Sequence, residues 1–160
     1  MSIFETIKTR RSVRTFSGEP LRDEDARRIS EYAKSVTNPY GINVDLRVMK
    51  ASECGISSSV VTGEDTYIAG KVKRIPHAEE AYGFSLERVL LFAESLGVGN
   101  VWLAGTFSKN AAKEAMQVSD EEILPAVSPL GYAAEKMSLR ETVMRRGTGA
   151  DKRIPFEGAN

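Results

Sequence analysis

The feature that most constrains the fold is one long segment, residues 76–97, whose apolar residues recur with helical spacing. Pro76 suits the first turn of a helix, and Gly97 suits the position just beyond its end. At a rise of 1.5 Å per residue, the segment predicts a helix of roughly 30 Å, about the width of a small domain. The run 89–92 makes it apolar on more than one side. We therefore expect this helix to be central in the fold or to lie at a subunit interface.

Shorter segments with helical and strand patterns surround the long helix. Helices are predicted near residues 3–7, 23–36, 108–116 and 138–147, and strands near 44–49, 66–70, 101–105 and 125–132. Trp102 and Tyr132 have strand spacing and are expected in the core. The order of these segments lacks the regular rhythm of a doubly wound parallel sheet. We therefore expect a layered α+β domain that spans residues 1–160.

Composition excludes several classes of function. The 22 Lys and Arg residues balance the 22 Asp and Glu residues, so no long-range positive field favours nucleic acid or anionic lipid. No stretch reaches the run of about 18 apolar residues that a membrane span needs. Cys54 is the only cysteine and His77 the only histidine, which rules out an intrachain disulfide and disfavours a metal site. We expect a cytoplasmic protein with no nucleic-acid partner and no membrane partner.

A basic cluster near the N-terminus is the strongest candidate site. Side chains two apart in an extended segment point the same way, so Arg10, Ser12 and Arg14 are expected to converge. Arg11 and Val13 would then face the opposite side. Guanidinium groups offer paired donors at the spacing of phosphate oxygens. The residues alone leave two interpretations open, a phosphate site and a solvated basic stretch.

Motifs in order along most of the chain resemble those of the nitroreductase family. They are IFETI at residues 3–7, RRSVRTF at 10–16, AESLGVGNVW at 93–102, LGY at 130–132 and KRIP at 152–155. VTG at 61–63, PHAEE at 76–80 and MSLRE at 137–141 are similar to a divergent branch of that family. The resemblance implies a nitroreductase-like layered α+β fold, in which helices flank a mixed sheet. It also implies that the chain corresponds to the N-terminal part of a longer member.

For the chemistry, the resemblance implies an FMN site without catalytic side chains. The implied ligands of the phosphate and ribityl chain are Arg10, Arg11, Ser12, Arg14 and Arg153, and Leu103, Ala104 and Gly105 would supply backbone near the flavin ring. NAD(P)H would reduce the flavin, which would then reduce a small-molecule acceptor such as a nitroaromatic or a quinone. The family also implies a homodimer, which the apolar segment 87–97 favours.

A function of a different class stays open beside this one. Residues 35–41 differ from the Pro-Ser-x-x-Asn-x-Gln-Pro-Trp segment of many nitroreductases. The alternative is therefore a non-catalytic or weakly flavin-binding dimerisation module with an incomplete site. The absorption spectrum of the purified protein separates the two, because bound oxidised FMN is yellow.

Overall fold

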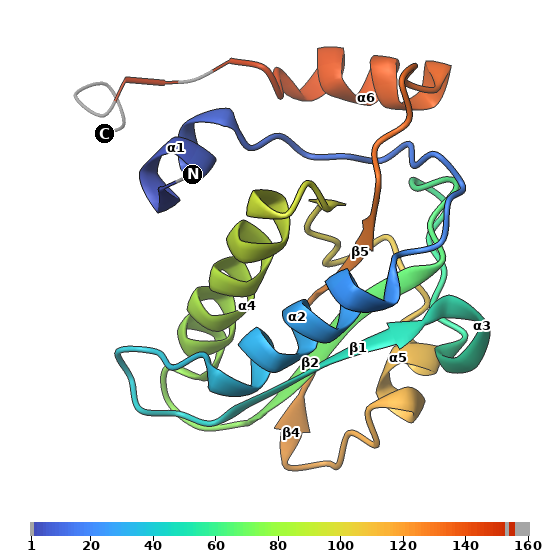
Figure 1. Ribbon diagram of the computed structural model, residues 1–160. Coiled ribbons are helices and arrows are strands. Elements are labelled where there is room, and N and C mark those ends of the chain that lie inside the picture. Colours follow the sequence, from blue (N-terminus) through green and yellow to red (C-terminus); the bar gives the residue numbers. More distant parts are fainter. Residues whose placement is uncertain (1, 153, 156–160) are drawn as a thin grey trace.

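The computed structural model describes residues 2–152, 154 and 155, and its helices surround one sheet (Figure 1). The helices are α1 (Ile3–Thr9), α2 (Asp23–Ser35), α3 (Ala51–Cys54), α4 (Ala78–Ser95), α5 (Lys109–Ala115) and α6 (Leu139–Thr148). The strands are β1 (Val44–Lys50), β2 (Thr66–Lys73), β3 (Gly99–Asn100), β4 (Glu122–Ile123) and β5 (Val127–Gly131).

The strands of the described residues form an antiparallel sheet in the order β1-β2-β5-β3, and β4 pairs with the end of β2. An isolated bridge between Thr15 and Thr62 is parallel, and it joins the segment after α1 to the loop before β2. The expected α+β fold, with helices on a sheet, is confirmed. Among the described residues all strand pairings are antiparallel, and the one parallel pairing is this isolated bridge, which lies outside the strands.

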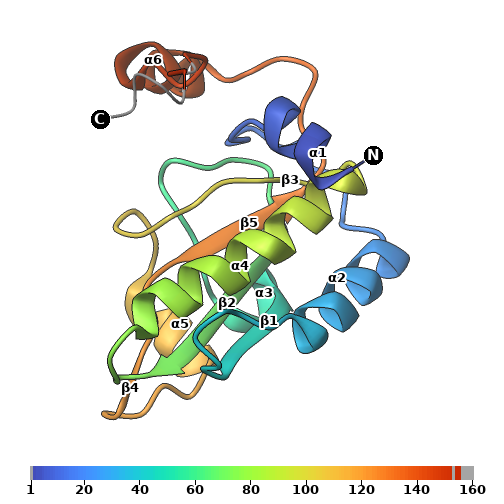
Figure 2. The same ribbon diagram turned by 90° about the vertical axis from the view of Figure 1, so that its left-hand side faces the viewer.

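Strand β2 is central, and its alternating side chains build two separate parts of the core. Ile68 and Val72 pack on the side of α2 and α4, whereas Tyr67 and Ala69 pack on the opposite side. Helices α3 and α5 cover that opposite side, as the two perpendicular views show (Figures 1 and 2). Both faces of β2 are therefore buried, which explains the short, nearly continuous apolar run in its sequence.

Helix α4 confirms the prediction of a long central helix. Val89, Leu90 and Ala93 are fully buried within the chain itself. The hydroxyl of Tyr82 donates a hydrogen bond to the carbonyl of Ala126 at 2.5 Å, which ties the helix to the segment before β5. No helix among the described residues is long and apolar enough to cross a membrane. These apolar residues of α4 are therefore used inside the fold.

The strand expected over residues 101–105 is wrong. The strand β3 ends at Asn100, because the next amide, that of Val101, donates to the side chain of Ser128 at 3.1 Å instead of to a strand carbonyl. Leu103 keeps one isolated bridge to Val127. The expectation that Trp102 is a core residue also fails, since 36% of it is exposed.

Helix α1 is present, but its apolar residues are not buried. Ser2 and Glu5 form a capping box at its start, as the local sequence pattern favours. Thr6 is its buried residue, whereas Ile3 and Phe4 are exposed, Phe4 by 74%. The helix therefore presents an uncovered apolar face beside the basic cluster that follows it.

Candidate anion-binding site

The segment that carries the basic cluster packs directly on two paired glycines at one end of the sheet, Gly99 and Gly131, which we call the glycine seat. Gly99 of β3 pairs in register with Gly131 of β5. A Cβ atom at Gly99 would lie 2.9 Å from Val13 Cγ2, and one at Gly131 would lie 2.8 Å from Phe16 Cδ1. The amide of Val13 also donates to the carbonyl of Asn100 at 2.9 Å. The absence of two side chains thus lets residues 13–16 lie directly on the strands.

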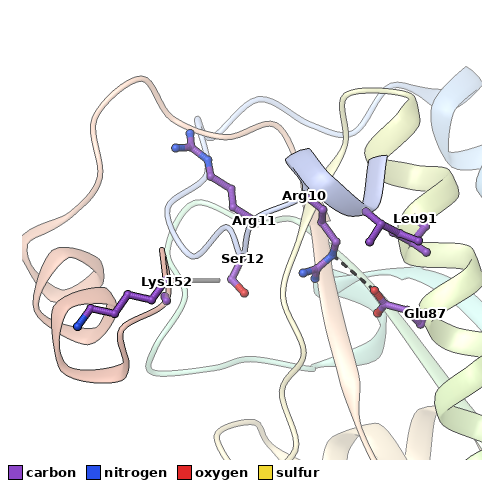
Figure 3. A pocket seen from close by; sticks show the side chains of 8 residues that line it. Arg10, Arg11, Ser12, Glu87, Leu91 and Lys152 are labelled. Atoms are coloured by element: carbon purple, nitrogen blue, oxygen red, sulfur yellow. Dashed lines mark ion pairs between the residues drawn. The ribbon is translucent and has the colours of Figure 1, made fainter. Parts of the chain in front are cut away.

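A pocket of about 240 Å³ opens where this segment leaves α1, between α4 and the segment that follows α6 (Figure 3). Its lining residues are Ile7, Arg10, Arg11, Ser12, Glu87, Leu91, Ala150 and Lys152. The lining therefore carries three basic side chains, one hydroxyl and one carboxylate. Such a set can receive an anion that accepts several hydrogen bonds.

The guanidinium of Arg10 lies in the wall of the pocket beside two neighbours. Its Nη2 donates to Asn100 Oδ1 at 2.8 Å, and its Nε lies 3.8 Å from Glu87 Oε1 (Figure 3). Asn100 is fully buried, and its Nδ2 donates to the carbonyl of Leu90 at 3.2 Å. Trp102 Nε1 in turn donates to Glu87 Oε2 at 2.6 Å. Asn100 thus ties Arg10 to the β3 region and to α4, and Glu87 adds a longer ion pair.

Arg14 differs from Arg10 in its partners. Its Nε and Nη1 atoms are buried and have no hydrogen-bond partner among the described residues. Burial lowers the pKa of Arg14, the negative charge of Glu141 raises it, and the positive charge of Arg145 lowers it further. Buried donors without acceptors are costly, so they point to an acceptor that is not part of the described chain.

Helix α6 docks on the basic segment through buried polar groups. Arg145 Nη1 donates to the carbonyl of Ser12 at 2.8 Å, and the hydroxyl of Thr15 donates to Glu141 Oε2 at 2.5 Å. Glu141 and Arg145 are each only 4% exposed, and Arg145 also pairs with Asp151. These contacts bring Ala150 and Lys152 to the pocket. The capping box of residues 138–141 predicts this helix, but no local pattern indicates what it docks on.

The structure brings together three of the residues that the sequence singles out, namely Arg10, Arg11 and Ser12. Figure 3 shows Arg10 and Ser12 directed to one side and Arg11 to the other, as the alternation predicts, but Arg14 does not line the pocket. The reason is that residues 10–14 do not form a regular strand, and sheet bridges begin only at Thr15. The alternation of a strand therefore does not extend to Arg14.

The remaining candidate positions either do not line this pocket or lie outside the described residues. Leu103 is buried and exchanges two backbone hydrogen bonds of 2.9 Å with Val127. Ala104 and Gly105 are exposed and do not line the pocket of Arg10. Arg153 lies outside the described residues. Lys152, its neighbour, is a lining residue that the sequence analysis missed.

A second carboxylate of α4, that of Glu94, lies close enough to Arg10 and Arg11 to interact with their charges. One oxygen of Glu94, Oε2, is buried and has no hydrogen-bond partner among the described residues. Burial raises the pKa of Glu94, and the positive charges of Arg10 and Arg11 counteract part of this effect. The helix α4 therefore places negative groups on the same side as the basic cluster.

Comparisons with known proteins agree with this architecture. A family model described as "Putative TM nitroreductase" matches residues 2–156. No curated protein matches the sequence. A nitroreductase family protein from Clostridium difficile 630 is 16% identical with a TM-score of 0.73, over 98% of this chain and 95% of that chain. An FMN-dependent nitroreductase from Clostridium difficile R20291 is 15% identical with a TM-score of 0.67, over 84% and 90%. An oxidoreductase containing FMN is 14% identical with a TM-score of 0.77, over 99% and 88%.

Proposed function

Because this chain belongs to the TM nitroreductase family, we propose that it is an FMN-dependent oxidoreductase. In this proposal NAD(P)H is the electron donor, and the acceptor is a small molecule such as a nitroaromatic or a quinone. When bound, the flavin supplies the hydride and electron transfer. The observation that carries the proposal is the pocket of Arg10, Arg11 and Ser12, together with buried donors of Arg14 that have no partner among the described residues.

The residues of the pocket fit the phosphate end of FMN. Arg10, Arg11 and Lys152 contribute three positive charges and Glu87 one negative charge, which leaves a net lining charge of 3 − 1 = +2. A phosphate monoester carries a charge of about −1.5 to −2 at neutral pH. The volume of about 240 Å³ is below the roughly 300–1,000 Å³ of a whole cofactor site. We therefore assign the phosphate to this pocket and the ring to a place outside it.

The protein's own groups bind and orient in this proposal, and none of them reacts. Arg10, Arg11 and Ser12 hold the phosphate, and Arg14 offers its donors to another oxygen of the cofactor. Leu103, Ala104, Gly105 and Arg153 stay proposed contacts by family resemblance. Support for FMN comes from the fold shared with an FMN-dependent nitroreductase and with an oxidoreductase containing FMN.

We also propose a homodimer, supported by apolar surface that the single chain leaves uncovered. Leu139 and Val143 are 87% and 70% exposed, and their spacing of four residues places them on one side of α6. Phe4 of α1 is exposed as well. Light scattering at micromolar concentration is expected to give a dimer that Val143→Asp weakens. A wild-type monomer would contradict this part of the proposal.

The decisive experiment is titration of the purified protein with FMN, followed by anaerobic mixing with NADH and with NADPH. We expect FMN to bind more tightly than riboflavin, which lacks the phosphate, and its absorbance to be lost with at least one donor. Riboflavin bound as tightly as FMN would refute the phosphate site. Bound FMN that neither donor reduces would refute the oxidoreductase.

Bound FMN that neither NADH nor NADPH reduces would favour the alternative, a weakly flavin-binding dimerisation module. One observation favours this alternative, namely that Glu87 places a carboxylate among the lining residues of the anion pocket. In that case the dimer should form without flavin, and the affinity for FMN should be low in the presence of salt.

A further inference from the structure

We propose that Glu87 is a resident counter-ion of the anion pocket, which competes with a bound phosphate for Arg10 and so sets the affinity of the site. This inference rests on the proposed phosphate site and adds a specificity-determining residue to it. Glu87 belongs to α4, lines the pocket and lies directly beside Arg10 (Figure 3).

The carboxylate of Glu87 is fixed in place, although 38% of its side chain is exposed. Its Oε2 accepts a hydrogen bond of 2.6 Å from Trp102 Nε1, and its Oε1 lies 3.8 Å from Arg10 Nε. The indole therefore keeps the negative charge at the rim of the pocket. An anion that enters finds one of its three cations already partly neutralised.

Two roles for Glu87 predict opposite results, and the distances decide between them. If Glu87 mainly positioned Arg10, its removal would weaken anion binding. The ion pair at 3.8 Å, however, is longer than the 2.7–3.2 Å of a hydrogen bond. Asn100 Oδ1 holds the same guanidinium at 2.8 Å, and Asn100 is itself fully buried and bonded to the carbonyls of Leu90 and Val98. Arg10 therefore stays in place without Glu87, and the loss of a negative charge is the larger effect.

The variant Glu87→Gln tests this, because the amide oxygen can still accept from Trp102 while the charge is gone. We would titrate flavin-free protein with inorganic phosphate by isothermal calorimetry, at low and at high ionic strength. The removed charge lies next to a ligand of about two negative charges in a partly exposed pocket. We expect phosphate to bind about five- to tenfold more tightly to Glu87→Gln at low salt, and the gain to shrink at high salt.

Two matched variants separate local charge from other causes. Glu79→Gln removes the same charge from the exposed first turn of α4, eight residues away along the helix, and is expected to bind phosphate like the wild type. Glu87→Asp keeps the charge with a shorter side chain and should stay within about twofold of the wild type. Circular dichroism spectra and melting temperatures show whether each variant is folded.

Trp102 supplies a second readout in the wild type, since it is the only tryptophan of the chain. Phosphate that competes with Glu87 for Arg10 is expected to change the emission of Trp102 along the same binding curve. Phosphate binding without any change of emission would place the anion away from Glu87 and overturn the inference.

The outcomes for Glu87 and for the proposed function are distinguishable. If phosphate binds the wild type but Glu87→Gln binds it equally or more weakly, Glu87 is no competitor, and the phosphate site itself stands. If neither protein binds phosphate, both the anion site and its counter-ion are refuted. If phosphate binds as expected but FMN does not, the counter-ion stands and the flavoprotein assignment fails.

Discussion

Replacement of Arg14 by methionine should make the flavin-free protein more stable and its binding of FMN weaker. Methionine has a length similar to the aliphatic part of arginine and carries no hydrogen-bond donors. In the wild type, Nε and Nη1 of Arg14 are buried without partners among the described residues. A residue that costs stability in the empty protein and supplies affinity for a ligand is a mark of a binding site.

The expected changes in stability and in FMN affinity follow from Nε and Nη1 of Arg14. A buried donor without a partner costs about 1–3 kcal/mol. Removal of Arg14 also removes its attraction to Glu141, which raises the pKa of Arg14 and opposes the effect of burial. We therefore expect a net stabilisation at the lower end, about 1 kcal/mol. A lost hydrogen bond between charged groups should weaken FMN by about 1.5–3 kcal/mol, which is about tenfold to 150-fold in Kd.

Urea unfolding followed by the fluorescence of Trp102 measures the stability, and quenching of flavin fluorescence measures the Kd. Arg27→Met is the matched control, because Arg27 is exposed and pairs only with Glu31 of its own helix among the described residues. This control should change stability by less than about 0.5 kcal/mol and leave FMN binding unchanged. An Arg14→Met protein that is less stable and binds FMN normally would refute the reasoning.

Three further changes test other parts of the site. Gly131→Ala places a methyl group 2.8 Å from Phe16 Cδ1. It should lower the free energy of unfolding in urea by about 1–3 kcal/mol and weaken the binding of FMN. An unchanged urea midpoint would disprove the close packing on the glycine seat. Arg145→Met removes the hydrogen bond to the carbonyl of Ser12. The amides of α6 should then exchange with deuterium about tenfold faster or more, while the exchange of the α4 amides stays the same. Unchanged exchange of the α6 amides would argue against the docking of α6 through buried polar groups. Burial raises the pKa of Glu94, so the wild type should lose stability as the pH rises from the ordinary value of 4.5 through the raised pKa. Glu94→Gln should therefore be more stable than the wild type at pH 7 and equal to it below pH 4.5, and equal stability at both pH values would contradict the burial of Glu94.

Elements whose signal is local could be predicted from the sequence. The long apolar period of residues 76–97 predicts α4, and the alternation of residues 44–49 predicts β1, because each pattern depends on neighbours a few residues apart. The capping patterns at Ser2 and Ser138 mark the starts of α1 and α6. The pocket was predicted in part, since Arg10, Arg11 and Ser12 are adjacent in the chain and reach it together.

The parts that failed depend on contacts between distant residues. The run 101–105 has the composition of a strand, yet the amide of Val101 bonds to the side chain of Ser128, a partner no local pattern can indicate. Asn100 looks like an ordinary turn residue in sequence, but it is fully buried and holds Arg10 from 90 positions away. Arg14 was expected to converge with Arg10 and Ser12 but does not line the pocket, because the segment is not a regular strand. Tertiary contacts override local preference in each case.

The docking of α6 on the basic segment has a consequence for how the protein is made. Thr15 and Glu141, which meet in one hydrogen bond, are 126 residues apart. At a synthesis rate of about 5–20 residues per second, Thr15 is made about 6 to 25 seconds before Glu141 exists. During that interval the nascent chain carries the three arginines of the basic segment, Arg10, Arg11 and Arg14, with the pocket wall of residues 150–152 still absent. A ribosome-bound chain should therefore acquire its sheet before it can hold an anion, and cofactor loading becomes one of the last events of its biogenesis.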